Sequence, residues 1–279
     1  MSAQVPILDN HMHLDLKGHC VEAALEFQKA GGTAIMLVDK PDWGLMRTET
    51  GMRQQYEITL KIADLVRKDT GLKVFVTVAP HPALLPQLVK EMPLVEAVAL
   101  MKKGIDIAGQ LVAEKKVVAL GEVGRPHFPV PEEIMEASNG ILVYAMEKAK
   151  DLGCPATLHT ESSTEETFKF LAGLADKVGL KRDKVIKHFS PPLVDEKLNH
   201  GLFPSIVSSR DSIEKALKQG DRFLMETDYL DDLRRPGSVM GPKTVPKRTL
   251  DLLQKGKMTQ EQAFKIHKDN PEKIYGISL

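Results

Sequence analysis

Eight short runs of mostly apolar residues, rich in valine and isoleucine, recur along the chain and constrain its fold more than any other feature. They are typical of β-strands, and they span residues 5–11, 33–39, 72–80, 116–123, 155–160, 184–190, 203–209 and 222–228. The segments between them carry helical patterns, two of which end near Gly71 and at Gly153. Strands that alternate with helices predict a parallel sheet with helical crossovers.

The number of predicted strand–helix units indicates which α/β architecture the chain adopts. Most runs are apolar nearly throughout, as expected for strands covered on both faces. Eight such units in 279 residues predict a single closed (β/α)8 TIM barrel. An open doubly wound sheet is the alternative, but neither a Gly-x-Gly-x-x-Gly motif nor a phosphate loop follows the first run. No linker or internal repeat marks a second domain, so one domain over residues 1–279 is predicted.

Composition narrows the class of protein. The chain has 38 basic and 38 acidic residues, which argues against a surface that coats nucleic acid generally. Cys20 and Cys154 are too few for a disulfide framework and are interpreted as buried packing thiols. We find neither a signal-peptide pattern nor an apolar stretch of about 18 residues. The sequence therefore predicts a soluble cytoplasmic protein without a membrane partner, and it indicates no oligomeric state.

Ligand-type residues stand where the predicted strands end. The first run ends at His11, and His13 follows two positions later, a spacing that places both imidazoles on one face of a strand. The carboxyl ends of the strands meet at one mouth of a barrel, where catalytic residues gather. The other strand ends there carry Glu122, His159, His188 and Asp228. Four histidines and two carboxylates at one mouth are enough to hold two divalent ions.

Each of these residues also has a structural interpretation. His159 and His188 could be buried structural histidines, Glu122 could pair with a lysine or arginine, and Asp228 could cap the following segment. Their coincidence favours ligation, because several unpaired ionisable groups buried together are costly unless a metal compensates them.

The ordered motifs resemble one known family over essentially the whole chain. They are HMHLD, GEVGRPHF, LHTES, KHFSPP, METDYLDD and NPEKIYGI. Together they are similar to the TatD-related metal-dependent hydrolases of the amidohydrolase superfamily. The resemblance implies a TIM barrel, a centre of one or two metals and, in characterised members, nuclease activity on DNA. The implied ligand positions fall on His11, His13, Glu122, His159, His188 and Asp228.

The loops after two strands depart from the family pattern. Gly124 to Phe128 replace residues of the type GLDYY, and Tyr229 and Leu230 follow Asp228 where Ser or Ala and then Pro are usual. Because these loops face substrate, the chain is interpreted as a divergent branch of the family whose metal chemistry is better supported than its DNA substrate.

The expected mechanism uses a metal-bound hydroxide in a binuclear centre. His11, His13 and Asp228 are assigned to one ion and His159 and His188 to the other, with Glu122 between them. Glu122 and Asp228 are the expected catalytic residues, and Asp228 transfers the proton of the nucleophile. Mixed histidine and carboxylate ligands suit Zn, Mn, Co or Fe, and Mg less well.

Basic and aromatic residues near the same mouth are candidate substrate contacts. Residues 234–248 contain Arg234, Arg235, Lys243, Lys247 and Arg248 and no acidic residue, and Arg125 and Lys40 could add to them. His127 and Tyr229 complete the predicted substrate contacts, whereas roles for His81 and Trp43 stay open. The alternative for the basic segment is a solvated loop.

Three functions are compatible with these residues. The first is hydrolysis of phosphodiester bonds, as in a TatD-like DNase, with single-stranded DNA or a small molecule in the barrel mouth. The second is hydrolysis of an amide, ester or lactone by the same hydroxide. The third is a non-catalytic barrel that binds metal or ligand, against which the complete ligand set argues.

Overall fold

The computed structural model describes residues 5–279, and its strands in this range form one nine-stranded parallel sheet. The order is β8-β7-β6-β5-β4-β3-β2-β1-β9, so strands that follow one another in the chain from β1 to β8 are neighbours. The strands are β1 (Leu8–His13), β2 (Ala34–Val38), β3 (Lys73–Val78), β4 (Ala119–Gly124), β5 (Ala156–His159), β6 (Val185–Ser190), β7 (Phe203–Val207), β8 (Leu224–Glu226) and β9 (Tyr229–Leu230). This arrangement confirms the predicted α/β class with a parallel sheet.

The last predicted strand is divided into two short strands. β8 pairs with β7, whereas β9 pairs with β1, and Asp228 between them has a φ of 53°. The backbone N–H and the hydroxyl of Thr227 donate to the two carboxylate oxygens of Asp9 at 3.0 and 2.7 Å. A side chain of β1 thus takes the place of a backbone ladder, and within residues 5–279 no ladder joins β8 to β1 directly.

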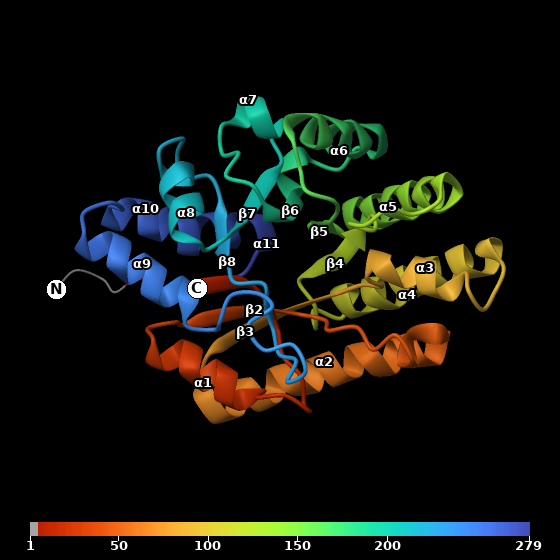
Figure 1. Ribbon diagram of the computed structural model, residues 1–279, viewed down its shortest axis with the longest axis horizontal. Helices are drawn as coiled ribbons and strands as arrows, with labels where there is room; N and C mark the ends of the chain where they lie inside the picture. Colours follow the sequence, from red (N-terminus) through yellow and green to blue (C-terminus); the bar gives the residue numbers. More distant parts are fainter. Residues whose placement is uncertain (1–4) are drawn as a thin grey trace.

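Helices surround the strands in chain order, from α1 and α2 through α5 and α6 to α8 and α9 (Figure 1). The longer helices are α1 (Val21–Lys29), α2 (Glu49–Thr70), α4 (Leu94–Ala113), α5 (Glu132–Leu152), α6 (Glu165–Val178), α8 (Arg210–Leu217) and α9 (Thr244–Gln254). Short helices are α3 (Leu85–Leu88), α7 (Glu196–Asn199), α10 (Gln260–Phe264) and α11 (Asn270–Tyr275). Among the described residues, no helix is both long and apolar enough to cross a membrane.

Local sequence explains where these helices begin and end. The Thr48 side chain caps α2 by accepting the N–H of Gly51 at 3.0 Å. Gly71 ends α2 with a φ of 74° and Gly153 ends α5 with a φ of 68°, a left-handed conformation in which glycine carries no Cβ penalty. The helix ends inferred from glycine in the sequence are thus confirmed at both positions.

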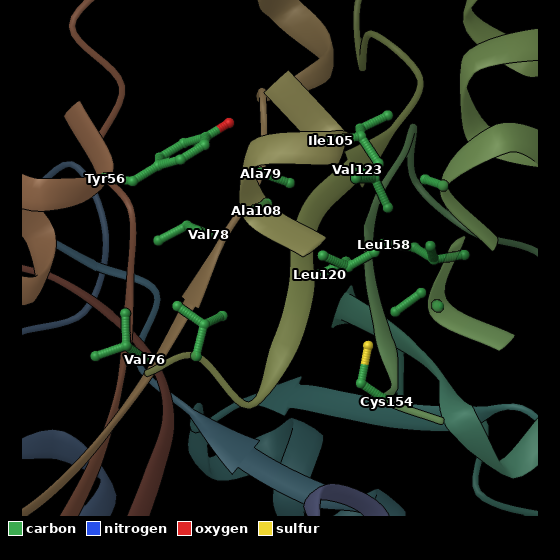
Figure 2. Packing of buried hydrophobic residues seen from close by; sticks show 14 of the residues in the cluster. Tyr56, Val76, Val78, Ala79, Ile105, Ala108, Leu120, Val123, Cys154 and Leu158 are labelled. Atoms are coloured by element: carbon green, nitrogen blue, oxygen red, sulfur yellow. The ribbon is translucent and has the colours of Figure 1, made fainter. Parts of the chain in front are cut away.

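The largest core lies between the strands and their helices. Figure 2 shows side chains of β3, β4 and β5 together with those of α4, among them Val78, Leu120, Leu158 and Ile105. Cys154 is buried in this cluster, as predicted, whereas Cys20 is only partly buried. A rigid scaffold therefore supports the strand ends where the ligand-type residues lie.

Candidate metal centre

The six predicted ligand residues lie at the carboxyl ends of the strands. His11 and His13 are on β1, Glu122 on β4, His159 on β5 and His188 on β6, and Asp228 lies between β8 and β9. Parallel strands point the same way, so these ends share one rim of the sheet. Residues separated by up to 217 positions in the sequence are thereby brought within a few ångströms of one another.

The Glu122 carboxylate stands at the middle of this cluster. Its Oε1 is 2.8 Å from Nδ1 of His159 and 3.5 Å from Nε2 of His188. Its Oε2 is 3.6 Å from Nε2 of both His11 and His13. Burial favours the neutral acid, but His11 and the hydrogen bond from His159 hold the pKa of Glu122 well below its usual value. Glu122 is therefore a buried anion surrounded by imidazoles.

Gly124 allows β4 and β5 to approach closely enough for this contact. Its φ is 146°, and a Cβ at this position would lie 2.0 Å from the carbonyl oxygen of His159. The next residue, Arg125, donates its N–H to that same oxygen at 2.9 Å. Only glycine fits at this position, which fixes Glu122 beside His159.

His11 and His13 converge as their spacing predicts. Their Nε2 atoms are 3.1 Å apart, and Oδ1 of Asp228 lies 3.8 and 3.6 Å from them. Nδ1 of His13 donates to the carbonyl oxygens of Asp39 and Val38 at 3.0 and 3.2 Å, which leaves its Nε2 as a free lone pair. Burial lowers the pKa of His11, but the carboxylates of Glu122, Glu226 and Asp228 together outweigh burial and raise it to about 9. A cation bound at this point would replace that proton.

His188 joins the group from β6. Its ring stacks on His11 with centroids 3.7 Å apart, and its Nδ1 lies 2.9 Å from Oε1 of Glu226. Burial, reinforced by His11, keeps the pKa of His188 well below its usual value, so the ring is neutral and able to bind a metal. Glu226 also accepts the Ser205 hydroxyl and the N–H of Phe189. Sequence reasoning missed Glu226, although its spacing of two from Asp228 hinted at a shared face.

His81 and His127 approach the centre from the other side. His81 Nε2 is 3.9 Å from Oε1 of Glu122, and its Nδ1 accepts the N–H of Ala83 at 3.1 Å. Burial keeps the pKa of His81 well below its usual value, so the neutral ring carries its proton on Nε2 and offers a donor rather than a lone pair. Nδ1 of His127 is 2.7 Å from Nε2 of His159. His127 therefore reaches the centre through His159.

The donor atoms fit a divalent cation. Three groups have all their donor atoms within 4.8 Å of one another: His11, His13 and Asp228; His11, Glu122 and His188; and His81, Glu122 and His159. The first two contain imidazole lone pairs and carboxylates, the mixture that Zn, Mn, Co and Fe accept. The structure groups His188 with His11 rather than with His159, in contrast to the assignment made from the sequence.

Most of the predicted substrate residues have other partners. Arg125 pairs with Glu161 and lies 4.8 Å over the ring of Phe170. Arg234 and Arg235 both bond to Asp232, with side chains 89% and 62% exposed. Neither arginine contacts a ligand-type residue within the described part of the chain. Both arginines lie within three residues of Asp232, on a turn that brings their side chains to its carboxylate. The sequence pattern did not reveal this pairing.

Tyr229 and Lys40 belong to a second, partly buried network beside the centre. Asp231 accepts the backbone N–H groups of Asp15, His19 and Cys20 at 3.1, 2.8 and 2.8 Å, and also the Tyr229 hydroxyl at 3.3 Å. Lys40 bonds to the Asp15 carboxylate and to the carbonyl of Asp231 at 2.6 and 2.7 Å. This network fixes the loop after β1 instead of presenting charge to a substrate. Trp43, 38% exposed, packs edge-on against His81.

Comparisons with known proteins show the family and the fold of the chain. Residues 8–276 match the family model described as TatD related DNase. An uncharacterized protein of Methanocaldococcus jannaschii is 43% identical over 99% of this chain and 97% of its own length. A solved TatD homologue of Escherichia coli K12 has a TM-score of 0.68 at 15% identity, covering 99% of this chain and 100% of its own. A lactonase of Deinococcus radiodurans has a TM-score of 0.65 at 13% identity, covering 98% and 97%. At such identities the two solved structures show the fold alone.

Proposed function

Because the chain belongs to the TatD related DNase family, we propose that it is a metal-dependent hydrolase of phosphodiester bonds with single-stranded DNA as its substrate. The family and the clustered donor atoms support a metal-dependent hydrolase. The observation that carries the proposal is the buried Glu122 anion, which has five histidines within 3.9 Å. An apolar core would stabilise the fold at least as well as a buried carboxylate surrounded by imidazoles. The cluster is therefore better explained by metal binding than by a structural role.

The proposed roles follow from the position of each side chain. His11, His13 and Asp228 would hold one cation, and Glu122, His188 and His159 would supply the remaining donors. A divalent cation bound there lowers the pKa of a water molecule and polarises the bond under attack. Asp228, whose side chain is 19% exposed against 3% for Glu122, is the carboxylate that solvent and substrate can reach. We assign to this carboxylate the transfer of a proton from water to the leaving group.

The proposal also covers the closure of the barrel, the number of domains and the location of the protein in the cell. Residues 224–230 contact β7 on one side and β1 on the other, which supports a barrel closed through Asp9 and Thr227. We further propose that residues 1–279 act as one hydrolase domain and that the protein works in the cytoplasm.

Hydrolysis of an amide, ester or lactone is the second candidate, favoured by one observation. Arg125, Arg234 and Arg235 are bound to Glu161 and Asp232. These three of the cations expected to neutralise a scissile phosphate are therefore engaged elsewhere, and a neutral carbonyl substrate would not need them.

Cleavage of end-labelled single-stranded DNA tests the proposed function. We expect cleavage that requires added Mn or Zn, stops in EDTA and falls by about 10² to 10⁴ in Asp228→Asn, because a general base contributes on that order. The variant is purified in parallel, so that residual activity in it reports a contaminating nuclease. If the metal-loaded protein hydrolyses a lactone or an ester but not the oligonucleotide, the phosphodiesterase proposal is wrong and the second candidate function takes its place.

Glu226 provides a test of the metal site that does not depend on the substrate. In Glu226→Gln we expect the affinity for Zn to fall about 10- to 100-fold, because the carboxylate beside Nδ1 of His188 orients that ring. Competition with a chromogenic chelator measures the affinity. Exposed Glu96→Gln serves as the control, and an unchanged affinity in Glu226→Gln would remove His188 from the ligand set.

A further inference from the structure

A second concave site lies on the same rim, between the beginnings of α8 and α9. It is an open cleft of about 550 Å³ that contains none of the ligand-type residues described above. Four basic side chains line it, from Arg210 at the start of α8 and from Lys243, Lys247 and Arg248 around the start of α9. The cleft therefore gathers positive charge from two segments that follow β7 and β9.

Only part of this charge is neutralised within the protein. Lys243 pairs with Glu26 at 3.1 Å, and the acidic residue of the cleft, Asp251, pairs with Lys255 at 2.7 Å. Arg210 and Lys247 are exposed, and we find no ion pair for either among residues 5–279. In the described part of the chain, Arg248 donates to a backbone carbonyl, that of Ser208, at 3.3 Å. Within residues 5–279, Arg210, Lys247 and Arg248 consequently face the cleft without a direct ion pair, and Asp251 acts on Arg210 and Arg248 only at longer range.

The helix beginning beside the cleft adds to its attraction for anions. α9 has eleven residues and starts at Thr244 without a side-chain cap. The first N–H groups of a helix carry partial positive charge, which favours phosphate or other anions nearby. In TIM barrels, phosphate sites recur at the loops after the seventh and eighth strands together with a helix N-terminus.

A short path of contacts connects the cleft to the candidate metal centre. Arg248 bonds to the carbonyl of Ser208, whose N–H bonds to the carbonyl of Glu226 at 2.9 Å. The Glu226 side chain in turn lies 2.9 Å from His188. Because the two sites are adjacent on one rim but share no lining residue, a ligand that occupies both must be extended.

We propose that this cleft is a phosphate subsite that binds the backbone of a polynucleotide substrate away from the scissile bond. The inference rests on the proposed phosphodiesterase function and deepens it. Guanidinium and ammonium groups are the donors that bind phosphate oxygens. The basic segment recognised in the sequence thus divides in two: Arg234 and Arg235 bind Asp232, while Lys247 and Arg248 join Arg210 in the cleft.

The test compares two double variants with the same loss of charge. Arg210→Gln/Lys247→Gln removes the two exposed cations of the cleft, and Lys61→Gln/Lys68→Gln removes two exposed lysines of α2. Binding of a labelled single-stranded oligonucleotide is measured by fluorescence anisotropy in EDTA, so that no cleavage occurs. We expect the cleft variant to bind on the order of tenfold more weakly and its plot of log K against log [salt] to be shallower by about 1.4, since each phosphate contact contributes about 0.7. The α2 variant should match the unmodified protein.

Hydrolysis of bis(p-nitrophenyl) phosphate by the metal-loaded protein separates the two proposals. This diester is too short to reach the cleft, so we expect the cleft variant to lose activity only on the oligonucleotide, through a higher KM. If the unmodified protein hydrolyses the small diester but both double variants bind the oligonucleotide equally well, the subsite is wrong and the function stands. If it hydrolyses neither phosphodiester, the proposed function fails and the subsite falls with it.

Discussion

Replacing Glu122 by glutamine is expected to lower both the metal content of the protein and its hydrolytic kcat/KM, the latter by at least about 10³-fold, or ~4 kcal/mol. The substitution preserves the shape of the side chain but removes the negative charge that faces His11, His13, His159 and His188. Without that charge, a cation among these imidazoles has only Asp228 to neutralise it. Metal analysis after dialysis measures the first effect, and steady-state kinetics measures the second.

The control for this variant is Glu161→Gln. Glu161 also lies near the end of β5, but it pairs with Arg125 and contacts no proposed ligand. Its metal content should equal that of the unmodified protein. If Glu122→Gln retained full metal content and activity, the carboxylate would be a structural ion-pair partner, and the proposed centre would have to be rebuilt around Asp228.

The stability of the metal-free protein is expected to decrease by about 3 kcal/mol through His267 alone as the pH falls from 7 to 4. His267 is 1% exposed, its Nδ1 donates to the carbonyl of Leu8 at 3.2 Å, and its Nε2 lies 2.8 Å from the Thr249 hydroxyl. Burial lowers its pKa from 6.5 to about 4. Between these values the unfolded chain binds a proton that the folded chain does not, so acid favours unfolding.

Comparison with His267→Gln isolates this contribution. Other groups, including Asp9, whose pKa burial raises to about 7, titrate in both proteins and cancel in the difference. The variant should be less stable at pH 7, and its deficit in the free energy of unfolding should shrink by about 3 kcal/mol by pH 4 in urea titrations. Exposed His19→Gln should follow the unmodified protein at every pH. A deficit that stays constant would show that His267 takes up its proton without unfolding.

The ligand-type residues at the strand ends could be predicted from the sequence because each is adjacent in the chain to the apolar run of its own strand. A run of apolar residues that ends in His-x-His or in a carboxylate carries its own signal, and parallel topology brings such ends to one rim. The split of the last strand was not predictable in the same way. Thr227 bonds to Asp9, 218 residues earlier in the chain, and no local pattern announces that contact.

Ion pairing distinguishes basic residues that the sequence pattern treats alike. Arg234, Arg235 and Lys247 are alike in the sequence, since each lies in a segment without acidic residues. The structure gives the first two a shared partner in Asp232, whereas Lys247 faces an open cleft. Arg210 lies outside that segment in the sequence but lines the same cleft. An ion pair depends on distance in space, and charge patterning along a chain does not encode that distance.

The sequence by itself determined the α/β class, the succession of strands, the helix ends at glycine and the candidate ligands, because each rests on periodicity or on residue type at one position. Tertiary structure alone decided how those ligands group. His188 stacks on His11, His159 turns toward Glu122 and His127, and Glu226 and Asp231 enter as buried carboxylates that orient a ring and a loop. Such roles follow from burial and from contacts between distant segments, which exist only once the chain has folded.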